Sequence, residues 1–554
     1  MVKQPKPLPL RPSSHNHLFC KIRLLGFGDC QNSFVISRGS QIRSRKVKSK
    51  KITSALISVF YKDGLEPIIR ELHKHNVTIY STGGTQSFIE GLGVPVKSVE
   101  GLTGYPSILD GRVKTLHPMV FGGILAIREE AHQTQLAQFK IPEIDLVIVD
   151  LYPFEETVAK TKDEAEIIEK IDIGGISLIR AAAKNFGDVA VVPSKDEYAF
   201  LLDCLQKKDG CTDLEDRREL AHRGFKVSSN YDTAIFNYFN RGNEEMSFKH
   251  SMHQSEVLRY GENPHQSGVF YGNLSEMFDV LNGKALSYNN LVDVDAAVQL
   301  MREFQHSDPT FAILKHTNAC GVATRPTLVE AWKAALACDN VSAFGGIFVC
   351  NRTVDLATAQ EIDQLFYEVL IAPGFDADAL AHLSSKKNRI LLKIKNFYVQ
   401  SRSFRSLLNG VVEQDTDLKC ETPADLKQAT KLAPTAAEIS DLLFASTCVK
   451  HLKSNGIALV KDRQLIGMGC GQPNRVDALR QAIHKAKAFG FDLRGAVMSS
   501  DAFFPFPDCV EIAHLEGIDA VIHPGGSIKD QDSVDYCDAN GMRMVMTGTR
   551  HFRH

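Results

Sequence analysis

Alternating β-rich runs and amphipathic segments are the feature that most limits how this chain can fold. From Ile52 onward, apolar runs predict strands at 52–59, 77–80, 145–150 and 189–192. Segments with helical periodicity follow each of them, at 64–75, 85–92, 163–171 and 195–205. Strands separated by helices imply an α/β fold with a mostly parallel sheet covered on both faces. Ligands of such sheets bind at the carboxyl ends of the strands, so polar residues there are the first site candidates.

The chain is too long for one ordinary core, since 554 residues predict two or more folded units. The polar stretch at 240–255 has no hydrophobic period, and we place a domain boundary there, between 51–245 and 246–554. The chain has 44 % hydrophobic residues, 23 % charged residues and a formal net charge of −2. These values are typical of a soluble globular protein and give no reason to expect nucleic acid or a membrane as a partner.

Neither a metal site nor a membrane span is expected. The 12 cysteines form no CxxC pair, which is typical of reduced intracellular thiols and not of a disulfide or zinc framework. The sequence His514-Leu515-Glu516 imitates the H-x-E of zinc deaminases, but no P-C-x-x-C follows it, so the other ligands are missing. The longest apolar runs are far shorter than the ~20 residues that a membrane-spanning helix requires.

The first fifty residues have a different composition from the rest. Lys, Arg, Ser and Pro dominate residues 1–50, Asp29 is their only acidic residue, and no hydrophobic period persists. This composition resembles an organelle transit peptide, and a disordered basic tail is the alternative. We therefore expect the plastid stroma, with the mitochondrion as second candidate and the cytosol if the segment is no targeting signal.

Polar residues follow the predicted strands of the N-terminal domain. Residues 81–85, Ser-Thr-Gly-Gly-Thr, stand between a strand and a helix, where hydroxyls, free N–H groups and close backbone approach suit a phosphate. An ordinary tight turn with a threonine cap would explain the same residues. In the loop at 110–118, Arg112, Lys114 and Thr115 suit an anion or a developing oxyanion, and Tyr152 after a strand can donate into the same crevice. Asp172 before a glycine pair and Lys184 on the next helix are further candidates, each also explicable as a structural residue.

In the C-terminal domain, Lys315 and His316 stand side by side where an apolar strand from residue 311 ends. Neighbours on a strand point to opposite faces, so both can act on one ligand only if the chain is already turning. The residues that follow, with a turn expected at Cys320-Gly321, permit this. A capped histidine beside a solvated lysine is the structural alternative.

Other candidates of this domain are scattered along the chain. Arg259 can bind phosphate as a fork and stands beside Tyr260 in a turn stiffened by Gly and Pro. Three phenylalanines at 503, 504 and 506 can line a flat heteroaromatic ligand or belong to the core. The remaining candidates, each also explicable as a turn, a cap or a surface residue, are Asn290, Gly345, Asn455, Arg475, Asp508, Arg550 and His554.

Two segments of the C-terminal domain are similar to each other. The first runs from Ala-Cys-Gly at 319–321 through a helix at 327–337 to 342–346 and a strand. The second runs from Gly-Cys-Gly at 469–471 through a helix at 474–489 to a strand and 500–506. The common order suggests duplication of an α/β unit, although short apolar elements also match by chance.

Taken together, these segments resemble the bifunctional AICAR transformylase/IMP cyclohydrolase family of late purine biosynthesis, from about Ile52 to His554. The motifs STGGT, DGRVKTLHP, IDIGG, RAAAKN, RYGENPHQ, KHTNACG, SAFGG, SDAFFPF and RHFRH occur in family order. The resemblance implies a methylglyoxal-synthase-like domain followed by a transformylase domain of two cytidine-deaminase-like subdomains without zinc. It further implies formyl transfer from 10-formyltetrahydrofolate to AICAR, dehydrative closure of the product FAICAR to IMP, and a homodimer. Whether a monovalent cation is required cannot be read from the sequence.

The resemblance also implies roles for individual residues. Lys315 and His316 match the catalytic pair of formyl transfer. Lys114, Tyr152, Asp172 and Lys184 match residues around the ring being closed. Positions that match substrate or folate contacts are Lys62, Ser81, Thr82, Gly83, Gly84, Thr85, Arg112, Thr115, Arg259, Tyr260, Asn290, Gly345, Asn455, Arg475, Phe503, Asp508, Ser527, Arg550 and His554.

Departures from the family pattern are visible in two motifs. The family often has SVSDKTG where this chain reads SVFYKDG, so Phe60 and Asp63 replace hydroxyl residues at the nucleotide site. Ala319 stands where proline is common, which loosens the turn without removing a reactive group.

A regulatory nucleotide-binding protein that has lost turnover is one alternative function. A phosphate-sugar lyase built on the N-terminal fold is another, and it leaves the C-terminal half unexplained.

Overall fold

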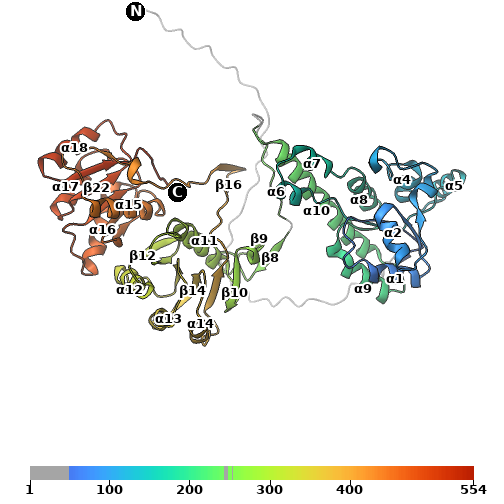
Figure 1. Cartoon of the computed structure of the whole chain (residues 1–554), viewed down its shortest axis with the longest axis horizontal. Helices are drawn as coiled ribbons and strands as arrows, with labels where there is room; N and C mark the ends of the chain where they lie inside the picture. Colours follow the sequence, from blue (N-terminus) through green and yellow to red (C-terminus); the bar gives the residue numbers. More distant parts are fainter. Residues whose placement is uncertain (1–48, 243–246, 253) are drawn as a thin grey trace, which may run out of the picture. The chain divides into compact units, whose positions relative to one another are not determined.

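The structure is a computed structural model that describes residues 49–242, 247–252 and 254–554. These residues belong to two compact units (Figure 1). Unit 1 contains the chain up to Tyr152 and Asp172–Phe225, and unit 2 contains Pro153–Ile171 and Lys226–His554. Residues 1–48, 243–246 and 253 lie outside the described part. The expected targeting segment and part of the predicted boundary fall there, so the bounds 51–245 and 246–554 stay a prediction.

Unit 1 is an α/β layer structure. Its strands are β1 (Lys50–Lys51), β2 (Ser54–Ser58), β3 (Thr78–Ser81), β4 (Lys97–Ser98), β5 (Leu146–Val149), β6 (Ala190–Val192) and β7 (Cys211–Thr212). Its helices are α1 (Glu66–Lys74), α2 (Gly83–Gly91), α3 (Val99–Thr103), α4 (Pro118–Leu125), α5 (Glu130–Gln138), α8 (Gly174–Lys184) and α9 (Tyr198–Lys207), with 3-10 turns η1 (Leu109–Gly111) and η2 (Lys195–Glu197). Helix α10 (Leu214–Phe239) begins in unit 1 and ends in unit 2.

The central sheet of unit 1 has the order β4-β3-β2-β5-β6, and all its pairings are parallel. From β2 the chain moves to β3, and from β5 it moves the opposite way to β6. Because parallel crossovers are right-handed, α1 and α8 cover opposite faces of the sheet. The strand order therefore switches between β2 and β5, which is where open α/β sheets bind ligands. The predicted parallel sheet is confirmed.

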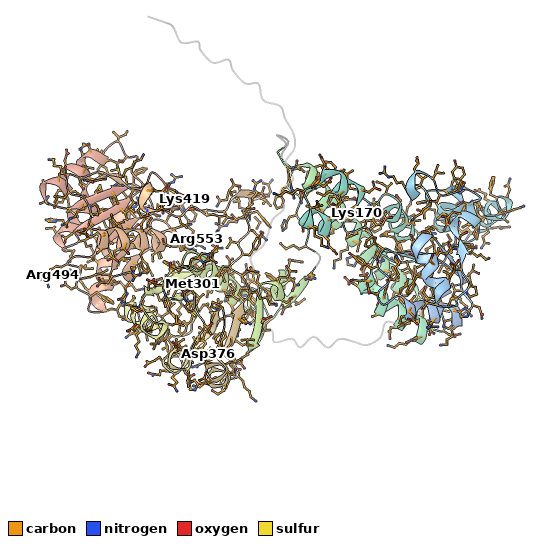
Figure 2. All side chains as sticks on the ribbon, in the orientation of Figure 1. Lys170, Met301, Asp376, Lys419, Arg494 and Arg553 are labelled. Carbon is orange, nitrogen blue, oxygen red and sulfur yellow. The ribbon has the colours of Figure 1, made fainter. Side chains whose placement is uncertain are left out.

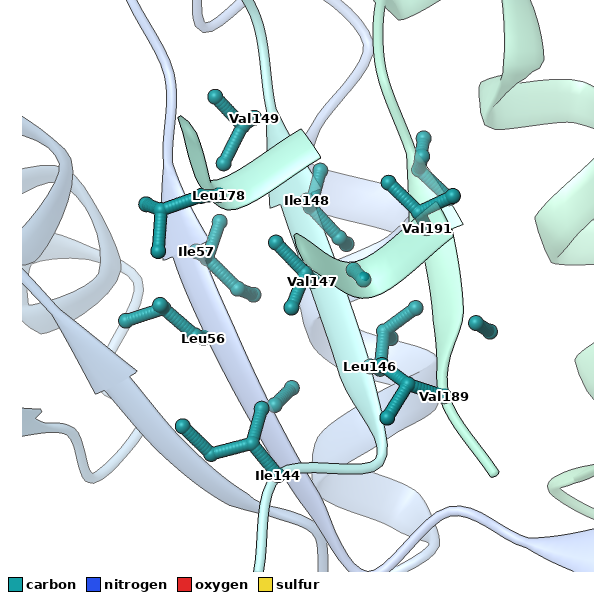
Figure 3. Packing of buried hydrophobic residues seen from close by; sticks show 14 of the residues in the cluster. Leu56, Ile57, Ile144, Leu146, Val147, Ile148, Val149, Leu178, Val189 and Val191 are labelled. Carbon is teal, nitrogen blue, oxygen red and sulfur yellow. The ribbon is translucent and has the colours of Figure 1, made fainter. Parts of the chain in front are cut away.

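The core of unit 1 explains why these runs form buried strands. All four residues of β5, Leu-Val-Ile-Val, are buried, as expected for a strand covered by helices on both faces. Figure 3 shows Ile57 and Leu56 of β2 beside Val147 and Ile148 of β5, with Leu178 of α8 packed over them.

Unit 2 is built around one mixed sheet of 12 strands. Its helices are α6 (Phe154–Lys160), α7 (Glu164–Glu169), α11 (Tyr288–Glu303), α12 (Leu328–Cys338), α13 (Leu356–Ile362), α14 (Ala377–Leu383), α15 (Ala436–Lys450), α16 (Arg475–Ala488), α17 (Asp508–Leu515) and α18 (Asp530–Ala539), with 3-10 turns η3 (Leu274–Glu276) and η4 (Pro423–Asp425). Its strands are β8 (Ser255–Leu258), β9 (Gly268–Tyr271), β10 (Phe278–Asn282), β11 (Thr310–Lys315), β12 (Asn318–Thr324), β13 (Gly346–Cys350), β14 (Tyr367–Ala372), β15 (Ile390–Ile394), β16 (Arg402–Leu407), β17 (Gly410–Asp415), β18 (Lys427–Gln428), β19 (Ile457–Lys461), β20 (Gln464–Gly469), β21 (Val497–Ser500), β22 (Ala520–His523) and β23 (Arg543–Met546).

The large sheet consists of two halves with the same topology. The first half has the order β10-β15-β14-β13-β11-β12, and the second half has the reverse order β20-β19-β21-β22-β23-β18. Equivalent pairs have the same sense: β11 and β19 pair antiparallel with β13 and β21, which pair parallel with β14 and β22. The halves meet where β12 lies beside β20, with Ala323 opposite Gln464. The predicted duplication therefore agrees with the topology.

The expected turn at Cys320-Gly321 and one equivalence in the predicted duplication are wrong. Cys320 and Gly321 lie inside β12 and form no turn; the chain turns earlier, at His316 and Thr317. Counted from the two hairpin turns, Gly321 is equivalent to Gly467 and not to the Gly-Cys-Gly sequence at 469–471. A Cβ on Gly321 would lie 1.9 Å from the carbonyl oxygen of Ala335 in α12, so this glycine marks a close strand–helix approach.

In the described part of the chain, no helix is long and apolar enough to cross a bilayer.

Candidate active sites

The first candidate site is the edge of unit 1 where β2 and β5 end. Buried Asp150, directly after β5, accepts the N–H of Tyr61 at 3.0 Å and the N–H of Phe60 after β2. The rings of Phe60 and Tyr152 meet edge to face, with centroids 5.7 Å apart, and both side chains are about two-fifths exposed. Asp150 thus ties the two strand ends together and fixes an accessible aromatic corner at the switch point. Sequence reasoning missed this carboxylate, because a lone aspartate at a strand end has no distinctive local signal.

The hydroxyls at residues 81–85, which were predicted to bind a phosphate, are used inside the fold. Ser81 donates its hydroxyl to the Ile57 carbonyl at 2.7 Å, and Thr85 donates to the Val59 carbonyl at 2.9 Å. The Thr82 hydroxyl lies 3.3 Å from that of Ser58. These hydroxyls therefore join β3 and α2 to β2, and none of the three lies at the surface.

Backbone N–H groups and one lysine remain for an anion. Gly83 and Gly84 are exposed at the start of α2, where Thr82 makes no side-chain cap. A Cβ on Gly84 would lie 4.0 Å from the Lys62 ammonium. That ammonium donates to the carbonyl oxygens of Val59 and Phe60 at 2.8 Å, which holds it near the strand end. Uncapped N–H groups beside a cation suit a phosphate.

Asp172 lies at the same edge. The carboxylate accepts the N–H of Gly175 at 2.6 Å at the start of α8, and it also accepts the N–H of Tyr152. Burial raises the pKa of Asp172, which opposes the lowering by these hydrogen bonds. The preceding glycine, Gly174, lies against buried Thr115, since a Cβ on Gly174 would lie 2.9 Å from the Thr115 hydroxyl. The predicted loop and the predicted aspartate therefore come together.

Lys114 and Arg112 belong to the same loop. Lys114 is half-buried and lies against Gly111, and Arg112 is exposed at the surface of the loop. Together with Lys62 they add three basic side chains to the loops at this edge of unit 1, which is the charge that an anionic ligand requires.

Lys184 is not brought to this edge. It is the last residue of α8, whose first residue stands beside Asp172. Eleven helical residues span about 16 Å. The next residue, Asn185, donates to the carbonyls of Ile124 and Ala126 after α4 and accepts the N–H of Val189 before β6. The exposed Lys184 therefore stands toward the amino ends of the strands, and its catalytic role depends on the resemblance alone.

In unit 2, Lys315 and His316 lie at the tip of the β11–β12 hairpin. Lys315 pairs with Asn318, so His316 and Thr317 form the two-residue loop, with φ values of 51° and 65°. Two positive φ angles are typical of a type I′ turn, whose twist matches that of the flanking strands. The predicted turn after Lys315 is therefore confirmed. His316 is exposed, and the Lys315 ammonium donates to the Phe344 carbonyl at 2.8 Å, beside Gly345.

A half-buried carboxylate on α11 holds this turn. Asp293 accepts the N–H of Thr317 at 2.8 Å and also the N–H of His316. Burial raises the pKa of Asp293 against the effect of these hydrogen bonds. The second half repeats the arrangement, since Asp441 on α15 accepts the N–H groups of Asp462 and Arg463 at 2.8 and 2.7 Å. The repeat was visible in sequence, but its role in holding the turn was not.

A chain of contacts joins the hairpin to the second half. The thiol of Cys470 lies 3.4 Å from the Asn318 amide oxygen. The Cys470 carbonyl accepts from the Gln472 amide at 3.3 Å, and the Gln472 carbonyl accepts from the Asn455 amide at 2.9 Å. The Asn455 amide oxygen accepts from Arg475 at 2.8 Å. The structure therefore links the hairpin that carries Lys315 and His316 to two of the predicted binding residues.

Arg475 is oriented by residues that the sequence did not single out. It donates to Asp501 at 2.8 Å and to the Phe503 carbonyl at 3.1 Å, and the Asp501 side chain is fully buried. Ser454 donates its hydroxyl to the other oxygen of Asp501 at 2.5 Å. The Nε of Arg475 is buried and has no hydrogen-bond partner among the residues that the structure describes, which leaves one donor for a ligand.

The three phenylalanines have different surroundings. Phe504 is completely buried in the core, whereas Phe503 and Phe506 are 38 % and 51 % exposed. The Lys529 ammonium lies 4.6 Å from the Phe506 ring centroid, which joins this loop to the one that carries Ser527. Asp508 starts α17 and accepts the N–H of Cys509. An exposed aromatic wall therefore remains available for a flat ligand.

Helix α11 connects a further loop to the hairpin. Buried Asn290 forms a capping box with Ser287 at the start of α11, so its amide is used for the helix. Its neighbour Asn289 donates to the Glu262 carbonyl at 3.2 Å, in the loop that begins with Arg259 and Tyr260. That loop therefore lies at the amino end of the helix whose Asp293 holds the His316 turn.

The C-terminal tail, residues 549–554, docks on the same region. The His551 N–H donates to the Asp501 carbonyl at 3.0 Å, and the Arg553 N–H donates to the Ser454 hydroxyl at 3.1 Å. Arg550 and His554 are exposed, and each lies beside the ring of Phe552. The predicted residues of the tail thus lie next to the Arg475 cluster.

Beneath the tail is a buried ionic network that sequence reasoning missed. Glu303 of α11 pairs with Lys450 of α15 at 2.9 Å and with His451 at 3.4 Å. Arg553 of the tail, labelled in Figure 2, lies 3.3 Å from the His451 ring. Burial raises the pKa of Glu303, but hydrogen bonds from His451, Cys420 and Lys450 lower it to about 2. The carboxylate therefore stays ionised and joins both halves to the tail.

Within the described ranges, no group of three or more His, Cys, Asp and Glu side chains is arranged to hold a metal ion. In the His-Leu-Glu sequence, Glu516 forms an ion pair with Lys487.

Unit 1 is a parallel α/β unit with basic side chains and an uncapped helix start at one edge of its sheet, and unit 2 is a duplicated α/β unit with a Lys-His turn joined by contacts to Arg475. These features are typical of an enzyme with two sites. The family model AICARFT/IMPCHase bienzyme matches residues 182–485, and the model MGS-like domain matches residues 64–177. The chain belongs to the AICARFT/IMPCHase bienzyme family. This confirms the family and the fold class expected from the motifs.

Curated relatives match nearly the whole chain. The bifunctional purine biosynthesis protein PurH of Bacteroides thetaiotaomicron is 59% identical over 508 residues, which cover 92% of this chain and 100% of that protein. The PurH proteins of Chlorobium chlorochromatii and Lactobacillus delbrueckii subsp. bulgaricus are each 45% identical, over 91% and 90% of this chain and 99% of their own lengths.

Proposed function

We propose that unit 2 transfers a formyl group from 10-formyltetrahydrofolate to AICAR and that unit 1 closes the product, FAICAR, to IMP. The chain is accordingly a bifunctional enzyme of purine biosynthesis, with formyltransferase and cyclohydrolase activities. The observation that carries the assignment of unit 2 is the His316-Thr317 turn. It presents an exposed imidazole directly after Lys315, and the hairpin is joined by contacts to Asn455 and Arg475.

Formyl transfer needs help at both reacting atoms, because the 5-amine of AICAR is delocalised into its imidazole ring and is a poor nucleophile. His316 removes the amine proton, with the carboxamide of the substrate as a relay, as the amine attacks the formyl carbon. Lys315 stabilises the charge that develops on the formyl oxygen. The carbon–nitrogen bond to tetrahydrofolate then breaks, and tetrahydrofolate leaves with a proton. Because the turn follows Lys315 at once, both groups can face one carbon.

Nucleotide and folate contacts complete this site. Arg259, Tyr260, Arg550 and His554 bind the AICAR phosphate, and Arg475 offers its unpartnered Nε to an anionic group. The exposed Phe503 supplies an aromatic surface for a flat ring. Asn290, Gly345, Asn455, Asp508 and Ser527 line the remaining surface, and Asn290 acts through the capping box that fixes the start of α11.

In ring closure the carboxamide nitrogen of FAICAR attacks the formyl carbon, and the oxygen leaves as water. Lys114 and Tyr152 stabilise the oxyanion and exchange protons, and Asp172 orients the amide. Lys62 and the N–H groups of Gly83 and Gly84 bind the phosphate, and Thr115 and Arg112 shape the loop beside it. Ser81, Thr82 and Thr85 act through the framework, since their hydroxyls are buried.

A pair of variants tests the division of labour. His316→Ala is expected to reduce formyl transfer by orders of magnitude while cyclisation of FAICAR continues at the wild-type rate. Tyr152→Phe is expected to reduce cyclisation and to spare formyl transfer. The measurements are spectroscopic release of tetrahydrofolate from formylfolate plus AICAR, and formation of IMP from added FAICAR. Wild-type protein that binds AICAR but releases no tetrahydrofolate would be a regulatory binder, and near-wild-type transfer by His316→Ala would end that assignment.

Lys184→Ala is assayed alongside on FAICAR. The position of Lys184 at the far end of α8 favours an unchanged rate, and a large loss would show that the residue reaches the site when substrate is bound.

Assembly and location belong to the same proposal. A homodimer is supported by the resemblance of the chain to its family, and size-exclusion chromatography with light scattering measures it.

The basic composition of residues 1–50 supports the plastid stroma before the mitochondrion, and a fluorescent fusion of that segment tests the location. A monovalent cation is tested by comparing formyl transfer in potassium and tetramethylammonium salts. Limited proteolysis tests the domain bounds 51–245 and 246–554.

A further inference from the structure

The C-terminal tail contains a histidine that neither proposed reaction step uses. His551 is 4 % exposed, and both its ring nitrogens face carboxylates: Nδ1 lies 2.6 Å from Asp417, and Nε2 lies 2.7 Å from Glu421. Both carboxylates belong to the connector, which we define as residues 416–422, after the β16–β17 hairpin. A neutral imidazole can donate from one nitrogen only, so two short contacts to carboxylates require the imidazolium form.

The charges around His551 also favour the imidazolium. Glu421 is buried, and its second oxygen accepts from the Ser446 hydroxyl at 3.2 Å, so Glu421 depends on His551 for its counter-charge. Asp417 is half exposed and has Lys450 as a second cation at 4.0 Å. Burial lowers the pKa of His551, but the hydrogen bonds to Glu421 and Asp417 outweigh burial and raise it. Removal of the proton would leave a buried carboxylate unpaired, which folded proteins avoid.

The backbone of the tail joins His551 to the residues around Arg475. The His551 N–H donates to the carbonyl of Asp501, whose carboxylate holds Arg475. Two residues later, Arg553 donates its N–H to the Ser454 hydroxyl and accepts the Ser454 N–H at 2.9 Å. Ser454 in turn donates to Asp501. The side chain of His551 therefore anchors a segment whose backbone is bound to Asp501, which pairs with Arg475, and to Ser454, which holds Asp501.

We propose that His551, clamped as an imidazolium between Asp417 and Glu421, is a positioning residue for formyl transfer that fixes the tail so that Arg550 and Arg475 can bind the anionic groups of the substrates. We name His551, Asp417 and Glu421 the tail triad. This inference rests on the proposed function of unit 2. The triad touches no reacting atom, so its loss weakens substrate binding in the ground state and the transition state alike. Such uniform binding appears in KM and leaves kcat nearly unchanged.

The first test is His551→Gln, which keeps the size of the side chain and removes the charge. The KM for AICAR is expected to rise at least tenfold, with kcat within threefold of wild type. Cleavage by trypsin after Arg550 and Arg553 is expected to become faster, because the tail is released. His484→Gln is the matched control, since His484 is exposed on α16. Cyclisation of FAICAR by unit 1 measures the concentration of active enzyme in every sample.

The second test is Asp417→Asn, which is nearly isosteric at a half-exposed position and decides the matter if His551→Gln fails to fold. A raised folded pKa means that the triad contributes fully below the ordinary histidine pKa of ~6.5 and is lost as pH rises through the folded value. Loss of the Asp417 charge lowers the pKa of His551, so the pH at which the KM for AICAR begins to rise is expected to move down. The other charged groups in contact with the triad or its neighbours are Lys450, Glu303, His451 and Arg553.

Two results would overturn the proposal. One is a KM for AICAR within twofold of wild type in folded His551→Gln. The other is an unchanged pH profile in Asp417→Asn, which is what a merely structural histidine predicts. Wild-type protein without any formyl transfer would instead refute the proposed function, so the two failures are distinguishable.

Discussion

Replacing Asp293 by alanine tests how the structure holds His316. The Asp293 carboxylate accepts the N–H groups of Thr317 and His316, two residues with positive φ angles that L side chains adopt at a cost. Hydrogen bonds to a charged group contribute about 1.5–3 kcal/mol. If this loss falls entirely on the geometry of His316, kcat/KM for formyl transfer falls roughly 10- to 150-fold.

Asp441→Ala is the matched control, because the duplication places the same contact in the second half. Asp441 accepts the N–H groups of Asp462 and Arg463 at 2.8 and 2.7 Å, so its removal destabilises a turn of the same kind without touching His316. Both variants are expected to lose similar amounts of unfolding free energy, but only Asp293→Ala is expected to lose formyl transfer.

The assay for stability uses Trp332, the single tryptophan of the chain. It is 1 % exposed in the core of unit 2, so its fluorescence during urea unfolding reports on that unit. Cyclisation of FAICAR provides the control for unit 1. Equal losses of formyl transfer in the two variants would mean that general destabilisation, and not the turn, controls the rate. A wild-type rate in Asp293→Ala would show that the turn is held without the carboxylate.

Two further substitutions test the packing of unit 2. Asp501→Asn leaves the buried guanidinium of Arg475 without its counter-charge. It is expected to destabilise unit 2 by roughly 3–5 kcal/mol, measured by urea unfolding. A loss of roughly 1 kcal/mol or less would contradict the burial of this ion pair. Gly321→Ala places a methyl group against the Ala335 carbonyl and is expected to destabilise by about 1–3 kcal/mol, whereas Gly410→Ala, in open space, leaves the unfolding midpoint unchanged.

The parallel sheet of unit 1 could be predicted because its signal is local. Each buried strand is a short apolar run, and each following helix has its own period. The candidate residues at the strand ends could be predicted for the same reason, since a residue that follows a buried strand must lie at the edge of the sheet. The position of Lys184 could not be predicted in the same way, because α8 carries its last residue about 16 Å from its first, and the motif does not show how the helix is directed.

The carboxylates that position the sites could not be predicted. Asp150, Asp293 and Asp501 act on residues 89, 24 and 26 positions away in the chain, and a single aspartate has no pattern that names a distant partner. Gly321 was misread for a physical reason of a different kind. Glycine marks turns, but it also marks places where a helix approaches a strand too closely for a Cβ, and only the fold distinguishes the two.

The two equivalent hairpin turns of unit 2 differ in their residues: the first carries His316 and Thr317, and the second carries Asp462 and Arg463. Eight residues after each hairpin turn stand Arg325 in the first half and Gly471 in the second. Arg325 donates to the Asp462 carbonyl at 2.6 Å and to Gln464 at 2.5 Å, so its side chain fills the space beside the second turn. A Cβ on Gly471 would meet no atom within 4 Å, so no side chain fills the equivalent position of the second half. Since both turns are held by equivalent aspartates, the common fold supplies the turn geometry, and the residues around each turn decide which one can receive a substrate.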